Sequence, residues 1–136
     1  MLFFGRSMNS KVKTWLSLAE DDLEFAGEVL ANKKRPHYAA HLCQQSVEKL
    51  LKAIVQYKTD TIPNRTHNFV SLCEQAKIEL PQDKMEWLLG LAPHYLGTRY
   101  PEDLAKLREK YSQDFSEKLY RETKEFFQWL RGTYLK

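Results

Sequence analysis

The chain has few of the residues that interrupt helices and few that form cross-links. Its 136 residues include five glycines, five prolines and two cysteines. The glycines and prolines stand mainly between apolar patterns, where they mark segment boundaries. No segment shows the alternation of apolar and polar residues that is typical of a strand, whereas apolar residues recur at helical spacing throughout. These absences indicate an all-α protein.

The chain also lacks a strong charge of one sign and a long apolar run. It has 21 Lys and Arg against 18 Asp and Glu, a net charge of +3, and the two signs are well mixed. Such a balance gives no electrostatic case for a nucleic-acid-binding arm or for attachment to a membrane surface. No apolar run approaches the roughly 20 residues that span a bilayer. We therefore expect a cytoplasmic protein without membrane association.

The two cysteines do not form a metal-binding or redox motif. Cys43 and Cys73 fall in predicted helices, without a second cysteine or a histidine at zinc-site spacing. We interpret both as buried thiols. The chain also has no Gly-rich phosphate loop, no nucleophile elbow and no HExxH motif. We therefore expect neither a metal nor a cofactor.

Helical periodicity predicts one domain over residues 10–136, preceded by an appendage, residues 1–9, that need not be ordered. Met1 and Met8 are both candidate starts of the chain. Long helices are expected at about 10–32 and 36–58, with another from Ser112 or Asp114 to about Gly132. Shorter helices are expected at about 68–77 and 85–97, while residues 103–111 are ambiguous. The predicted architecture is an antiparallel, up-and-down bundle of four to five helices.

The second predicted helix has a wide apolar arc, which suits burial on more than one side. Its narrow polar stripe includes His41, Gln45, Glu48 and Lys52, which stack on one face because they are three or four residues apart. Two interpretations remain open. The stripe is either a solvated face with a Glu48–Lys52 ion pair or a strip that faces a ligand or partner.

Three further polar residues call for partners. Asp22 lies within the apolar arc of the first helix, where an unpaired charge is costly, so we expect an ion pair, a contact with a helix end or a functional role. Gln44 lies on the apolar side of the second helix and is expected to contact a backbone group or a subunit interface. His67 precedes a helix that Thr66 or Asn68 would cap, and it is either a supporting contact or a weak candidate for a catalytic base.

The segment from His94 to Pro101 combines a histidine, two tyrosines and an arginine with a glycine and a proline. Arg99 at a helix end is suited to bind a phosphate or carboxylate, and the rings of Tyr95 and Tyr100 are suited to stack on a base. The alternative is that Arg99 caps its own helix while both tyrosines lie in the core. His94 and Arg99 are also weak catalytic candidates.

These motifs, in this order, resemble the HEPN family (higher eukaryotes and prokaryotes nucleotide-binding domain). The resemblance covers roughly Trp15 to Leu130. It is carried by Ala19-x-x-Asp22-Leu23-x-x-Ala26, Gln45-x-x-Glu48-Lys49-x-x-Lys52, Thr66-His67-Asn68-Phe69-x-x-Leu72 and Thr98-Arg99-Tyr100-Pro101. It implies a helical bundle that forms a homodimer and is paired with a minimal nucleotidyltransferase, as in toxin–antitoxin systems.

Many members of that family are metal-independent ribonucleases that use an Arg followed, after four to six residues, by a His. Arg99 has no such His, so the resemblance favours a non-catalytic module whose ligand-binding residues are Arg99, Tyr100, Tyr95, His94, Gln45, Glu48 and Lys52. Arg35 and His41 have the spacing, but they straddle the start of the second helix, and we interpret that match as a coincidence. A ribonuclease with a degenerate site, using Arg99 with His94 or His67, and a structural oligomerisation module are the alternatives.

Overall fold

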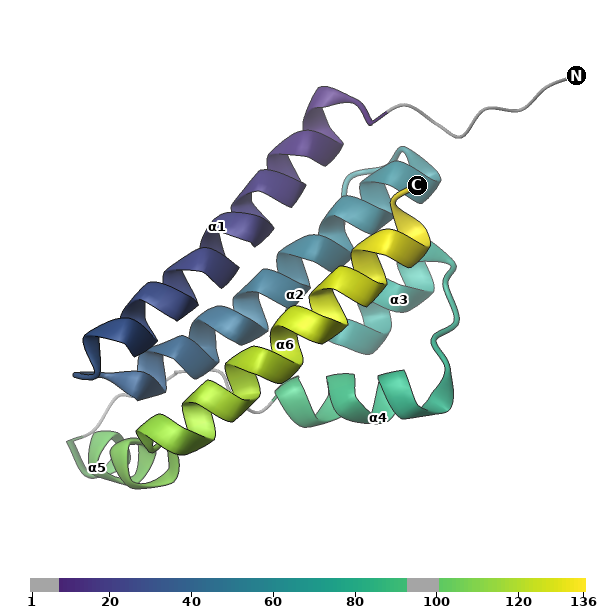
Figure 1. Ribbon diagram of the computed structural model, residues 1–136. Coiled ribbons are helices and arrows are strands. Elements are labelled where there is room, and N and C mark those ends of the chain that lie inside the picture. Colours follow the sequence, from purple (N-terminus) through teal and green to yellow (C-terminus); the bar gives the residue numbers. More distant parts are fainter. Residues whose placement is uncertain (1–7, 93–100) are drawn as a thin grey trace, which may run out of the picture.

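The protein is a helical bundle built around one central helix (Figure 1). The structure, a computed structural model, describes residues 8–92 and 101–136. Within these ranges it contains six helices and no strand. The helices are α1 (Ser10–Asn32), α2 (Pro36–Thr59), α3 (Phe69–Ala76), α4 (Gln82–Leu91), α5 (Pro101–Lys110) and α6 (Gln113–Tyr134). The all-α bundle predicted from the sequence is confirmed, and the ambiguous residues 103–111 belong mostly to α5.

A tight connection sets the relative direction of the first two long helices. The chain leaves α1 at Lys33, which has left-handed backbone dihedrals, and enters α2 with Pro36 in its first turn. Consequently α1 runs antiparallel to α2, and Figure 1 shows that it also runs antiparallel to α6. The side chain of Asn9 caps α1, and that of Ser112 caps α6. The cap of α1 therefore stands directly before Ser10, the first residue of the helix.

The central position of α2 explains its wide apolar arc. It contacts α1, α3, α5 and α6, and 15 of its 24 residues are buried. The large, fully buried side chains of the core include Leu50, Leu51, Ile54, Leu72, Leu88 and Leu130. Cys43 and Cys73 are buried free thiols, as predicted, and burial raises the pKa of each to about 11. Both are therefore protonated and unreactive at neutral pH.

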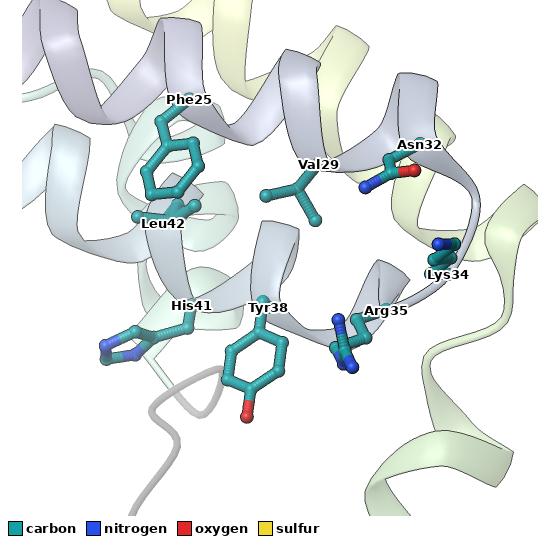
Figure 2. Close-up of a pocket in the computed structure, with 8 residues that line it drawn as sticks. All are labelled: Phe25, Val29, Asn32, Lys34, Arg35, Tyr38, His41 and Leu42. Carbon is teal, nitrogen blue, oxygen red and sulfur yellow. The ribbon is translucent and has the colours of Figure 1, made fainter.

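Several large apolar side chains remain at the surface of this bundle. The most exposed are Ile62 at 77%, Phe25 at 53%, Leu89 at 49% and Tyr38 at 46%. No described helix is both long enough and apolar enough to cross a membrane. Two of these residues, Phe25 on α1 and Tyr38 on α2, lie beside one surface hollow (Figure 2).

Candidate functional site

A buried carboxylate organises the polar stripe of α2. The Glu48 side chain is only 7% exposed, and it accepts hydrogen bonds from three side chains. The partners are Lys52 at 3.3 Å, Gln44 at 3.4 Å and Nδ1 of His67 at 2.7 Å. We call these four residues the Glu48 cluster. Because the carboxylate is buried and shared, the Glu48–Lys52 pair is not part of a merely solvated face.

The cluster joins two parts of the chain that are 19 residues apart. His67 belongs to the loop before α3, where Asn68 caps the helix by accepting from Ser71. The contact between His67 and Glu48 therefore fixes this loop against α2. His67 is the supporting contact expected from the sequence, although its ring is 72% exposed. Gln44 donates to Glu48 within its own helix.

A second ion pair links α1 to α2 beside this cluster. Nζ of Lys49 lies 2.6 Å from Oδ2 of Asp22, with the two side chains 25% and 17% exposed. Asp22 thus forms the ion pair expected of a carboxylate in an apolar arc. Lys52 lies 5.5 Å from the centroid of the Trp15 ring on α1, a cation–π contact. The cations of the stripe are therefore largely neutralised within the protein.

His41 continues the stripe towards the start of α2. Its Nε2 lies 2.9 Å from the amide nitrogen of Gln45, which can only donate, so His41 accepts at this atom as a neutral ring. Burial lowers the pKa of His41 below its ordinary value. The charges of Asp22 and Glu48 oppose this shift, whereas those of His67 and Lys49 add to it. The neutral form seen in the hydrogen bond is thus the one expected at neutral pH.

A hollow of about 520 Å³ opens where α1 turns into α2, and we call it the Tyr38 hollow. It is lined by Phe25, Val29, Asn32, Lys34, Arg35, Tyr38, His41 and Leu42. In Figure 2 the ring of Tyr38 stands between the side chains of His41 and Arg35, while Phe25 lies against Leu42. The hollow combines apolar walls, two exposed rings and two cations, a combination suited to a ligand that has both a ring and a negative charge.

The electrostatics of the hollow differ from those of the Glu48 cluster. No described carboxylate forms an ion pair with Lys34 or Arg35, whereas Lys49 and Lys52 are both paired. The first turn of α2 also has no acidic residue and no side-chain cap, so its positive dipole end is not compensated there. A negatively charged group would therefore meet uncompensated positive charge at the hollow and little of it along the stripe.

Only some of the candidate site residues from the sequence lie together in the structure. The structure brings Gln44, Glu48, Lys52 and His67 together and places Gln45 beside His41. His94, Tyr95, Arg99 and Tyr100 lie outside the described residues. The sequence analysis did not identify Tyr38, Phe25 and Lys34, since single exposed aromatic or charged residues are common on helix surfaces and carry no motif. Arg35 and His41, whose spacing was interpreted as coincidental, both line the Tyr38 hollow.

No group of three or more His, Cys, Asp or Glu side chains in the described parts of the chain is arranged to hold a metal ion.

The sequence model of the HEPN domain matches residues 12–133. The chain belongs to the HEPN family. The match spans the described helices from α1 to α6, so the whole bundle is the HEPN domain. No curated protein and no solved structure matches the chain significantly.

Proposed function

We propose that this HEPN domain binds a nucleotide or a nucleotide unit of RNA at the Tyr38 hollow. It does so as a homodimer that serves as the binding partner of a minimal nucleotidyltransferase. The observation that carries the proposal is the pairing of two exposed rings with two cations that no described carboxylate neutralises.

The cations determine where a phosphate would bind. Arg35 presents a planar fork of donors that suits a phosphate oxygen pair, and Lys34 adds a second positive charge at the same rim. Both residues precede the positive end of α2, which favours anions further. Lys52, by contrast, is held by Glu48 and the Trp15 ring, so it contributes less to anion binding.

The rings determine where a base would bind. Tyr38 is 46% exposed and Phe25 is 53% exposed, although each lies on a helix that buries other apolar residues. Stacking of a base on one aromatic ring contributes about 1–3 kcal/mol and depends little on the identity of the base. The hollow therefore favours nucleotides as a class and discriminates weakly among bases.

The polar stripe plays a supporting part in this proposal. Glu48 is too buried to make broad contact with a ligand, so its role is to position Lys52 and His67. Gln45 positions the ring of His41 at the edge of the hollow. His94, Tyr95, Arg99 and Tyr100 remain proposed ligand contacts, on the strength of the rings and the cation that cluster in that part of the sequence.

The homodimer and the nucleotidyltransferase partner are supported by the family resemblance and by the exposed apolar surface. Among described residues, seven large apolar side chains are exposed, and two of them, Leu18 and Phe25, lie on the same helix. Co-purification of a small nucleotidyltransferase with the natural protein would support the pairing. Its consistent absence from the purified complex would contradict this part of the proposal.

Isothermal titration with ATP, other nucleotides and short RNAs at fixed salt tests the binding function. Arg35→Ala and Tyr38→Ala should each weaken binding at least tenfold. Lys13→Ala, which removes an exposed cation on a different face of α1, should leave it unchanged. Tight binding that persists in both variants would refute the site. A stable dimer that binds no nucleotide or RNA would instead favour a structural oligomerisation module.

A second candidate function is metal-independent ribonuclease activity. Two observations favour it: Arg35 and His41 line one hollow with five residues between them, and His67 is paired with a buried carboxylate. To accept a proton from a 2′-hydroxyl, Nε2 of His41 must exchange its hydrogen bond with Gln45 for one with the substrate, and an arginine can stabilise the charge that develops on the phosphate. The earlier sequence candidates for this activity, Arg99 with His94 or His67, stay proposals.

RNA cleavage in excess chelator distinguishes the two functions. A ribonuclease should cleave at the same rate with and without chelator, and His41→Ala or Arg35→Ala should reduce the rate at least 100-fold. His67→Ala separates the two histidines, since it affects only a site built on the Glu48 cluster. Nucleotide binding without cleavage of any RNA would leave the binding module as the function.

A further inference from the structure

One edge of α1 is exposed along its whole length and has a regular pattern. We call it the α1 edge, and its residues are Lys11, Thr14, Leu18, Asp21, Phe25, Glu28 and Asn32, all exposed. Their spacing alternates between three and four residues, which keeps them on one line of the helix and is the spacing of a helix–helix seam. The residues that α1 buries in the core, such as Leu16 and Ala26, lie on a different face.

The α1 edge presents apolar side chains at the positions where two packed helices would make contact. Leu18 is 41% exposed and Phe25 is 53% exposed, with Trp15 and Val29 half-buried beside them. A hollow lies at each end of the edge. The Tyr38 hollow opens beside Phe25, and a second hollow of about 380 Å³, lined by Trp15, Leu18, Ile62 and Pro63 among others, opens near the start of α1.

The charges on the α1 edge indicate that it binds a second copy of the chain in the antiparallel direction. Lys11 stands near the start of α1, and Asp21 and Glu28 stand in its second half. Lys11 and Glu28 are 17 residues apart, or about 26 Å along the helix. An antiparallel second copy of the same edge would place Lys11 of each copy beside Glu28 of the other, with Asp21 of each copy opposite Leu18 near the two-fold axis. A parallel copy would instead place like charges side by side, which is unfavourable.

The surface formed by α1 and the adjacent helix is also large enough for a stable dimer. A helix of 23 residues is about 34 Å long, and a face formed by two adjacent helices is about 20 Å wide. The resulting area of roughly 700 Å² per copy is close to the approximately 800 Å² per partner of a standard interface. Beside the edge, Asp22 and Lys49 are already paired, whereas Asp21 on the edge forms no ion pair with a described residue.

We infer that the homodimer forms through the α1 edge, with the two α1 helices packed antiparallel about a two-fold axis. The inference rests on the homodimer of the proposed function and assigns its surface. In this arrangement the start of α1 from one copy lies over the Tyr38 hollow of the other. Each copy thus brings Lys11 and Trp15 near the ligand of its partner, and a complete site requires the dimer.

A charge-swap experiment measured by sedimentation equilibrium tests the assignment. Lys11→Glu and Glu28→Lys should each raise the dissociation constant of the dimer about tenfold, because two exposed ion pairs become two repulsive contacts. The double variant Lys11→Glu/Glu28→Lys restores opposite charges across the axis, so it should dimerise like the wild type. Both substitutions are at exposed positions, so all three variants should have the helical circular dichroism of the wild type.

Leu18→Glu provides a second readout, because it places a charge in the apolar part of the seam. It should give a monomer, whereas Leu89→Glu, at a comparably exposed position on α4, should stay dimeric. A dimer that tolerates Leu18→Glu and both single charge changes would overturn the interface but leave the proposed dimer intact. A monomeric wild-type protein would overturn both.

Discussion

Oε1 of Glu48, in the middle of α2, accepts a hydrogen bond of 2.7 Å from Nδ1 of His67, in the loop before α3. Glu48 is buried and His67 is largely exposed, so the contact connects the core of the bundle to its surface. The same carboxylate also accepts from Lys52 and Gln44. One buried side chain therefore determines the positions of three others.

Glu48→Ala should lower the free energy of unfolding by about 2 kcal/mol or more, since it leaves a lysine and an amide without their acceptor in a buried setting. Urea denaturation followed by circular dichroism measures the change. Glu24→Ala, at an exposed position on α1, is the matched control and should shift stability by less than about 0.5 kcal/mol. Equal losses in the two variants would show that the Glu48 cluster contributes nothing specific.

The ion pair between Asp22 and Lys49 should couple α1 to α2 measurably. A double-mutant cycle with Asp22→Asn and Lys49→Met isolates the pairwise energy. We expect about 1 kcal/mol, above the typical value for fully exposed pairs, because the side chains are only 17% and 25% exposed. A coupling energy of zero would mean that the two side chains are close without stabilising the helix pair.

Stability should fall in mildly acidic solution, and His37 should account for part of the loss. Burial lowers the pKa of His37, and the charges of Arg108 and Arg35 lower it further. Below a pH of about 6.5 the unfolded chain binds a proton that the folded chain does not, so the free energy of unfolding decreases as the pH falls. Above that pH both states are neutral and the contribution of His37 is fully present.

His37→Phe should reduce this dependence without abolishing it, because burial also lowers the pKa of His41. Unfolding curves between pH 7.5 and 5.5 for the two proteins measure the difference in slope. His37 is suited to this replacement, since its side chain is buried and its Nε2 has no hydrogen-bond partner in the structure. An identical slope in the variant would contradict the assignment of the proton to His37.

Because the chain has few glycines, residues with side chains adopt left-handed backbone dihedrals at the ends of some helices, which strains the backbone there. Lys77 closes α3 with φ 59°, a left-handed conformation that costs a side-chain-bearing residue about 1 kcal/mol relative to glycine. Lys77→Gly should therefore raise the free energy of unfolding by about 0.5–1 kcal/mol. Lys118→Gly, in the interior of α6, should lower it by a similar amount. A loss of stability in both variants would contradict the strain at Lys77.

The long helices α1 and α2 could be predicted closely because their apolar residues recur at a constant spacing over many turns, whereas α4 spans Gln82–Leu91 instead of the predicted 85–97. The predicted limits of α1 and α2 agree with the structure to within a residue, aided by Pro36 at the start of α2. The contacts that organise the polar stripe were harder to predict. Lys52 is a neighbour of Glu48 by helical spacing, but His67 reaches it only because the loop folds back across 19 residues.

The Tyr38 hollow could not be predicted from the sequence for a related reason. Tyr38 and Phe25 lie outside the buried faces of their helices, and only the packing of α1 against α2 brings the two exposed rings to one hollow. Which cations are paired could not be fully predicted from the sequence either. The sequence suggests a partner for Lys52, in Glu48, but none for Lys49, whereas the structure pairs both and leaves the positive charge at Lys34 and Arg35.

The central claim is that a nucleotide binds at the Tyr38 hollow, and amide chemical shifts measured during a titration with ATP test it most directly. In the 15N-labelled protein, the largest changes should fall in residues 25–32 and 34–42, and they should saturate along one binding curve. Changes centred on Trp87 and Glu122, at the opposite side of the bundle, or no changes at millimolar ATP, would contradict the account.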